Sequence, residues 1–153
     1  MTKTLAVAAI KSGTVIDHVP AGQALQIIRL LKVEANKNRV TVGLNLPSKQ
    51  LTRKDLIKIE DRFLSATEAN EITVFAPAAT INIIENFEVT RKIPAHLPEV
   101  VVNVFVCPNP ACVTHVEPVA SHFFVEAYGK NIKLSCKYCE KQYDRDRLHE
   151  YVI

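Results

Sequence analysis

The chain has 153 residues, of which 48% are hydrophobic and 23% are charged, and its formal net charge is +3. This composition is typical of a soluble globular protein with one ordinary core or two small ones, and it excludes a disordered chain. No apolar run approaches the roughly 20 residues that cross a bilayer, so a transmembrane segment is excluded as well.

The first apolar run is LAVAAI, residues 5–10. It is shorter than the apolar region of a usual secretory signal, little positive charge precedes it, and no clear cleavage site follows it. We interpret the run as a strand, and we expect a cytoplasmic protein with no membrane attachment.

The next segments read in turn as strand, helix and strand. TVIDHV at residues 14–19 is an extended run, and AGQALQIIRLLKVE at 21–34 has apolar residues at helical spacing. Val40 to Leu46 and DLIKIE at 55–60 then alternate between apolar and polar or small residues, with the loop PSKQLTRK between them. These two runs predict a pair of half-buried strands.

A second helix and a last strand complete this region. Ser65 and Glu68 are spaced for a capping box, and Pro77 would stop the helix that they begin. TINIIE at residues 80–85 predicts a strand. The order strand, helix, strand, strand, helix, strand predicts a ferredoxin-like βαββαβ sandwich, to which LAVAAI would add an extra N-terminal strand.

A domain boundary is indicated where Pro94 and Pro98 interrupt the pattern. We therefore expect one domain at residues 1–93 and another at 94–153. In the second, VVNVFV at 101–106 reads as a strand and SHFFVEAYGKNIKLSC reads as two strands around residues 129–131. The expected fold class is α+β, with the sandwich followed by a small all-β domain.

All four cysteines lie in this second domain, Cys107 and Cys112 as C-x4-C and Cys136 and Cys139 as C-x2-C. Paired cysteines at short spacing in a reducing compartment favour a metal site, with two disulfides as the alternative. Four thiolates can surround one Zn²⁺ tetrahedrally and leave no open position, which predicts a structural ion. His115 is the one nearby rival ligand, and we interpret it as a surface or supporting residue. A domain of about sixty residues needs such a metal to stay folded.

Residues that alternate with the core pattern would line the sheet face opposite the helices. They are mainly apolar with a few lysines, which suits a ligand with a flat base and an anionic tail, although solvated lysines on an open sheet fit the pattern too. The residues concerned are Asp17, His18, Leu56, Lys58, Asn82, Ile84 and, as a second phosphate cation, Lys92. The sequence has no G-x-S-x-G motif and no sign of an activated thiol or open metal site, so we do not expect an enzyme.

A zinc-ribbon protein that binds nucleic acid is the alternative function. Residues 1–93 carry 13 Lys and Arg against 9 Asp and Glu, but residues 94–153 carry 6 against 7. Four thiolates on Zn²⁺ would make the second domain still more negative, which repels a phosphate backbone. The strand DLIKIE also lacks the aromatic residues that stack on RNA bases. We therefore expect no nucleic-acid partner.

The segments GTVIDHVPAG, RVTVGLNLPS, RKDLIKIE, CPNPAC and CKYCEK follow one another along the chain. In their order and spacing they resemble the regulatory chain family of aspartate carbamoyltransferase. This resemblance runs from end to end of the chain. It implies a non-catalytic subunit of pyrimidine biosynthesis whose first domain binds CTP, ATP and UTP as allosteric effectors. It also implies a zinc domain that contacts the catalytic chain, and regulatory homodimers, joined through the first domain, that bridge two catalytic trimers.

The resemblance also assigns site residues by position. The base and ribose would contact Val7, Ala8, Ile10, Val15, Asp17, Leu56, Asn82, Ile84, Phe87 and Val89. Lys58, Lys92 and His18 would line the ribose and phosphate end. In the second domain, Asn109 matches a position that contacts the catalytic chain, and Lys141 matches one that forms an interchain ion pair.

Overall fold

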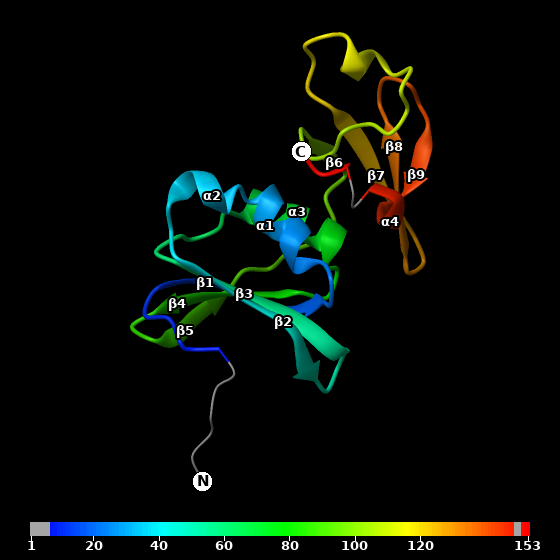
Figure 1. Cartoon of the computed structure of the whole chain (residues 1–153). Coiled ribbons are helices and arrows are strands. Elements are labelled where there is room, and N and C mark those ends of the chain that lie inside the picture. The colour runs from blue at the N-terminus through cyan, green and yellow to red at the C-terminus, as the bar shows by residue number, and fades with distance from the viewer. Residues whose placement is uncertain (1–6, 149–150) are drawn as a thin grey trace. The chain divides into compact units, whose positions relative to one another are not determined.

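A computed structural model describes residues 7–148 and 151–153 of the chain. The chain divides between His96 and Leu97 into two compact units. Each unit contains one antiparallel sheet, of five strands in the first and four in the second (Figure 1). Among the described residues no helix is both long and apolar enough to cross a membrane.

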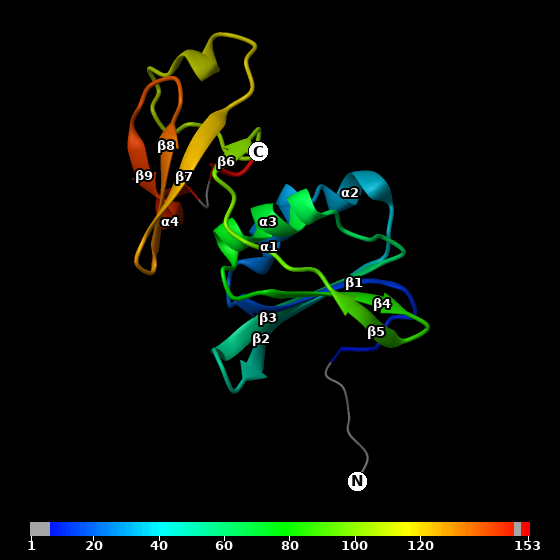
Figure 2. The same ribbon diagram turned by 180° about the vertical axis from the view of Figure 1, so that it is seen from behind.

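The first unit has the predicted strand and helix order. Its sheet has the order β2-β3-β1-β4-β5. The strands are β1 (Gly13–Pro20), β2 (Val40–Ser48), β3 (Thr52–Glu60), β4 (Thr80–Glu85) and β5 (Glu88–Lys92), and the helices are α1 (Ala24–Leu30), α2 (Val33–Asn36) and α3 (Ala66–Phe75). All three helices cover the same face of the sheet, as Figures 1 and 2 show from opposite sides. The ferredoxin-like sandwich is confirmed.

The core of this unit lies between the helices and the inward face of the sheet. Successive side chains of a strand point to opposite faces, so every second residue of β1, β3 and β4 enters the core. The inward isoleucines are at most 2% exposed: Ile16, Ile57, Ile59, Ile81 and Ile83. The helices contribute Ala24 and Ile27 from α1 and Ile72 from α3, each 0% exposed. This burial leaves the other face of the sheet free to carry a site.

The helices follow local signals in the sequence. The capping box of α3 is present, because the Ser65 side chain accepts from the Glu68 N–H and the Glu68 side chain accepts from the Ser65 N–H. The helix predicted at residues 21–34 is divided into α1 and α2. Lys32 separates them in a left-handed conformation, with φ at 51°, which an α-helix cannot contain.

The expected N-terminal strand is wrong for the part of LAVAAI that is described, residues 7–10, and Leu5 and Ala6 lie outside the described residues. The carbonyls of Val7 and Ala8 accept hydrogen bonds from the Lys58 ammonium, at 3.3 and 2.8 Å, instead of from a neighbouring strand. The fifth strand of the sheet is β5, which pairs with β4. Every residue of β5 is exposed, so no apolar alternation marked it in the sequence.

The second unit has a sheet with the order β6-β7-β8-β9. Its elements are β6 (Val100–Val102), the short 3₁₀ helix η1 (Val113–His115), β7 (His122–Tyr128), β8 (Asn131–Cys136), β9 (Gln142–Asp144) and α4 (Arg145–Leu148). The hairpin of β7 and β8 is as predicted, whereas β6 is shorter than expected and β9 was not anticipated. Phe105 and Phe123 form an edge-to-face pair in the core, with ring centroids 6.1 Å apart. The small all-β domain of the predicted fold class is thus confirmed.

Candidate functional site

A hollow of about 450 Å³ lies on the sheet face opposite the helices. This volume falls within the usual range of sites for small molecules. The residues that line it come from the segment before β1 and from β1 to β5: Val7, Val15, Asp17, Leu46, Pro47, Lys54, Leu56, Lys58, Asn82, Ile84 and Val89. Most of them are apolar, and three charged side chains stand among them.

The charged side chains of the hollow are Asp17, Lys54 and Lys58. The Lys54 ammonium lies 2.9 Å from Oδ1 and 3.1 Å from Oδ2 of Asp17. Burial alone would raise the pKa of the Asp17 carboxyl, but the hydrogen bond from Lys54 and the charges around it bring that pKa below its ordinary value. Burial lowers the pKa of Lys58, against the attraction of Asp17. The Asp17 carboxylate neutralises the Lys54 ammonium in this ion pair. The Lys58 ammonium is therefore the charge of the hollow that can bind an anionic ligand.

One polar group of the hollow has no partner. The side-chain oxygen of Asn82 is buried and accepts no hydrogen bond. A buried acceptor without a partner costs about 1–3 kcal/mol. A ligand that donates an N–H or O–H at this position would remove that cost, and such donors are present on nucleotide bases and on ribose.

Eight of the thirteen residues predicted for the effector site line the hollow, and five do not. Ile10 is buried at 6% exposure, and the Ala8 carbonyl holds Lys58. The His18 ring lies 3.0 Å from the Thr80 hydroxyl, Phe87 is 62% exposed in the turn between β4 and β5, and Lys92 is exposed and pairs with Asn82 across the strands. The assignment of these five to the site stays a prediction.

Three residues of the hollow were not among the predicted site residues: Leu46, Pro47 and Lys54. The period of two along β3 already indicated Lys54, because it precedes Leu56 and Lys58 on the same face. Leu46 had no comparable signal. A bulge in β2 changes the alternation just before it, and the sequence pattern does not reveal a bulge.

The four cysteines meet in the second unit, with all four sulfurs within 4.8 Å of one another. Cys107 and Cys139 have their sulfurs 3.7 Å apart, and Cys112 and Cys136 have theirs 3.8 Å apart. These distances exclude disulfides, whose S–S bond is about 2.05 Å. They match the edge of a tetrahedron of sulfurs around zinc, about 3.8 Å for Zn–S bonds of about 2.3 Å.

The surroundings of the thiols also fit a divalent ion. Burial raises the pKa of Cys107 to about 12. Burial would also raise that of Cys139, but hydrogen bonds, first that from Asn109, lower it to about 7. Four neighbouring thiolates therefore need a cation to compensate their charge, and Zn²⁺ would supply it.

His115 is not part of the cysteine cluster. Its Nε2 lies 2.8 Å from the carbonyl oxygen of Cys107. His115 is the last residue of η1, which begins directly after Cys112. The Thr114 hydroxyl donates to the Cys112 sulfur at 3.2 Å. Both side chains therefore hold the loop that carries the first cysteine pair, which is the supporting place expected for His115.

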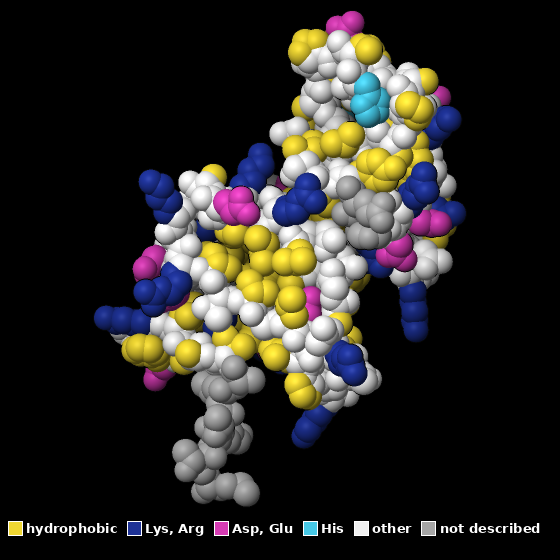
Figure 3. All heavy atoms as spheres, in the orientation of Figure 1, with side chains coloured by type: hydrophobic (Ala, Val, Ile, Leu, Met, Phe, Trp, Pro, Cys, Tyr) yellow, Lys and Arg dark blue, Asp and Glu magenta, His cyan; other side chains and the backbone are white. Residues whose placement is uncertain are grey.

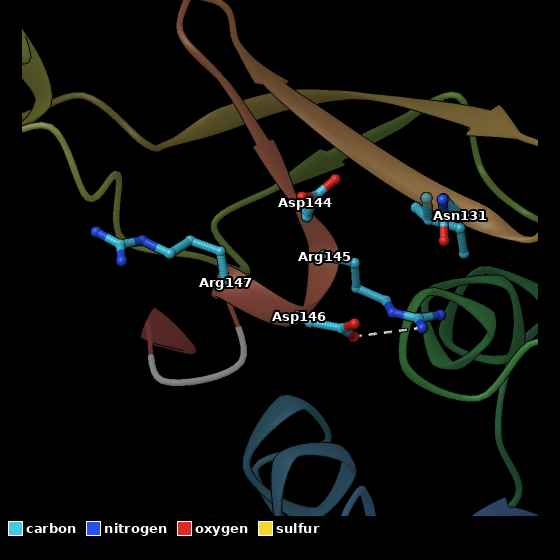
Figure 4. A pocket seen from close by; sticks show the side chains of 6 residues that line it. Asn131, Asp144, Arg145, Asp146 and Arg147 are labelled. Atoms are coloured by element: carbon cyan, nitrogen blue, oxygen red, sulfur yellow. Dashed lines mark hydrogen bonds and ion pairs between the residues drawn. The ribbon is translucent and has the colours of Figure 1, made fainter.

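A second hollow, of about 250 Å³, lies between the start of β8 and the segment from β9 to α4 in the second unit (Figure 4). Its lining includes Asp144, Arg145, Asp146 and Arg147, and Arg145 lies 3.4 Å from Asp146. Acidic and basic side chains alternate and balance one another, so this hollow has no net charge that would select an ion.

Lysine and arginine side chains form no continuous stripe on the face seen in Figure 3. They are scattered there around hydrophobic and acidic side chains. A surface that follows a nucleic-acid backbone needs a basic groove or stripe. This face therefore gives no support to the nucleic-acid alternative.

Comparison with known proteins identifies both units. The family model described as the aspartate carbamoyltransferase regulatory chain, allosteric domain, matches residues 5–96, and the one described as its metal binding domain matches residues 99–149. Aspartate carbamoyltransferase regulatory chains are among the similar proteins: that of Photorhabdus laumondii is 50% identical over 93% of this chain and 92% of its own length, and that of Chromobacterium violaceum is 49% identical over 98% and 99%. That of Aliivibrio fischeri is 51% identical over 93% and 92%. The chain belongs to the aspartate carbamoyltransferase regulatory chain family, with an allosteric domain and a metal-binding domain that holds the four-cysteine cluster.

Proposed function

We propose that the chain is the regulatory, non-catalytic subunit of a cytoplasmic aspartate carbamoyltransferase and binds CTP, ATP and UTP in the hollow of its first unit. The observation that carries the proposal is the composition of this hollow, an apolar surface with one unengaged carboxamide oxygen and one lysine, Lys58, that is held by backbone carbonyls. The apolar surface suits a flat base, Asn82 suits a donor on the base or ribose, and lysines suit phosphates.

The Lys58 and Lys92 side chains would bind the phosphates of the nucleotide. In the structure, Lys58 is satisfied only by two backbone carbonyls among the described residues, Val7 and Ala8, which a triphosphate outcompetes because it carries full negative charges. Lys92 lies opposite Asn82 in the pairing of β4 with β5, and Asn82 and Lys58 both lie opposite Val15 of β1, so the three residues stand in one row across the sheet. Lys54 stays in its ion pair with Asp17, and this pair fixes both side chains in the lining of the hollow.

The second unit would dock on the catalytic chain. We assign residues 1–93 to the effector-binding domain and residues 94–153 to the zinc domain that contacts the catalytic chain. Asn109 lies between Cys107 and Cys112, and the carbonyl of Lys141 accepts from the Cys136 N–H, so the zinc site would fix both candidate contact residues. An effector changes activity only if it binds the two quaternary states unequally.

We also propose that two copies pair through the first unit. β2 is an edge strand of the five-stranded sheet. Leu44 on β2 is 49% exposed and the nearby Leu25 on α1 is 58% exposed, and both line a small hollow of about 100 Å³. An open edge with apolar side chains beside it is a surface that favours pairing with another chain. Three such dimers would bridge two catalytic trimers.

Calorimetric titration of the zinc-loaded chain with CTP and with ATP tests the effector site. The decisive variant is Lys58→Ala, Lys92→Ala, and its matched control is Lys49→Ala, Lys130→Ala, which removes the same charge from two exposed turns. We expect both nucleotides to compete and both to lose affinity only in the first variant. Equal binding to both variants would overturn the placement of the phosphates, and a salt-dependent gel shift with generic RNA would favour the nucleic-acid alternative.

A further inference from the structure

A buried carboxylate lies directly beneath the effector hollow. Asp55 is 0% exposed and sits on β3 between Lys54 and Leu56, which both line the hollow on the other face. Its Oδ1 accepts the N–H of Asn45 at 3.0 Å, and its Oδ2 accepts the N–H groups of Gly22 and Ala24 at 2.9 and 3.2 Å. One side chain thus joins β2 to the beginning of α1.

The contact on β2 is made at a bulge. Gly43 pairs with Leu56 and Leu46 pairs with Lys54, so the two residues between them on β2 stand opposite Asp55 alone. Asn45 has a φ of 57°, a left-handed conformation that costs a residue with a side chain some free energy. A bulge leaves its extra residue without a partner in the ladder. The Asp55 carboxylate supplies that partner.

The bulge decides which side chain of β2 enters the hollow. Counting by two from Gly43 without the extra residue would place Asn45 on the outer face and Leu46 on the helix face. With the extra residue, Leu46 comes opposite Lys54 on the outer face, and it lines the hollow. The apolar wall on this side of the hollow therefore depends on the bulge.

The Oδ2 atom of Asp55 fixes the orientation of the carboxylate. The N-cap residue of α1, Gln23, makes no side-chain capping bond, so the N–H groups at the beginning of this helix need an acceptor from elsewhere. Asp55 supplies it from β3. Because Oδ2 is held by the helix, Oδ1 has a fixed direction toward Asn45.

We propose that Asp55 is a positioning residue of the effector site, which holds the β2 bulge at Asn45 and thereby keeps Leu46 in the wall that contacts the nucleoside. This inference rests on the proposed function. Asp55 touches no ligand and acts through Leu46. Asp55 therefore contributes to the binding of the nucleoside and not to the binding of the phosphates, which the lysines contact.

A double-mutant cycle of Asp55→Ala and Leu46→Ala tests this role by calorimetric titration with ATP and with inorganic tripolyphosphate. We expect each single variant to weaken ATP by on the order of tenfold, as for the loss of part of one buried leucine contact, with tripolyphosphate unchanged. The double variant should be no weaker than either single one, because both remove the same contact. Additive losses would overturn the proposal.

Ser65→Ala is the matched control, because it removes a helix cap of the same unit and Ser65 does not line the hollow. It should lower the stability and leave ATP binding unchanged, which is also what Asp55→Ala would do if Asp55 were only structural. If Asp55→Ala does not fold, Asn45→Pro removes the N–H that Asp55 accepts and excludes the positive φ of the bulge, while the bonds from Asp55 to Gly22 and Ala24 remain. This variant should weaken ATP and spare tripolyphosphate, and unchanged ATP binding would overturn the proposal. Absence of ATP binding to the unsubstituted chain would instead overturn the proposed function and this inference with it.

Discussion

Removal of the metal should unfold the second unit and leave the first unit folded. The perturbation is displacement of zinc by a thiol-reactive mercurial, followed by a chelator and by removal of the mercurial with excess thiol. The four sulfurs come from two segments that are 24 or more residues apart, and the metal is the link that joins the loop at Cys107 and Cys112 to the turn at Cys136 and Cys139.

The expected loss exceeds the stability of the unit. A structural zinc contributes an apparent binding free energy of about 10–16 kcal/mol at neutral pH. A whole domain is stable by only about 5–15 kcal/mol, and one of this size is at the lower end. The edge-to-face pair of Phe105 and Phe123 and the buried Leu134 remain, but they cannot offset a loss of that size.

Amide hydrogen exchange measures the two units separately in the same chain. Amides in the paired strands β7 and β8 should lose protection when the metal leaves and regain it when Zn²⁺ is added back. Amides of β1 and β3 should keep their protection and serve as the internal control. Continued protection of β7 and β8 in metal-free protein would refute the reasoning, because the unit would then be held by its core alone.

Three further perturbations test the first unit and the core of the second. Ser65→Ala should destabilise the first unit by about 1 kcal/mol, since it removes the capping box of α3, and urea denaturation measures the change. Phe123→Ala should cost the second unit about 3–5 kcal/mol, because the side chain is 0% exposed, and the zinc-loaded chain should show it as a lower melting temperature of that unit alone. The Asp17 carboxyl has a lowered pKa in the folded chain, so its ion pair with Lys54 stabilises above the ordinary pKa of 3.8 and is lost as the pH falls through the lower folded value. Asp17→Asn should therefore flatten the acid limb of the stability profile near and below pH 4, and an unchanged acid limb would mean that this pair contributes nothing.

The alternation of the strands allowed the sheet and part of its site to be predicted. Asn82 and Ile84 were assigned to the face of β4 opposite the helices, and the structure has both in the hollow while Ile81 and Ile83, which alternate with them, lie in the core. Such a prediction succeeds because a regular strand has a fixed period of two, whatever its neighbours are.

The features that escaped prediction depend on contacts between distant residues. The bulge at Asn45 is stabilised by Asp55, ten residues away, and the segment at residues 7–10 gives its carbonyls to Lys58, some fifty residues away. β5 and β9 are short and mostly exposed strands, so they form by pairing with β4 and β8 and not by a pattern of their own. The cysteine cluster could be predicted because four thiols at such spacings have few other uses.

The alternation along β3 has a consequence for how this subunit can diversify. Leu56 and Lys58 face the hollow, and Ile57 and Ile59 between them lie in the core. Exchanges at the first two positions can therefore alter which effector is preferred while the packing that keeps the sandwich folded stays the same. A library restricted to such outward positions should yield mostly folded chains with new ligand preferences, provided that Asp55 and the bulge beside it are kept.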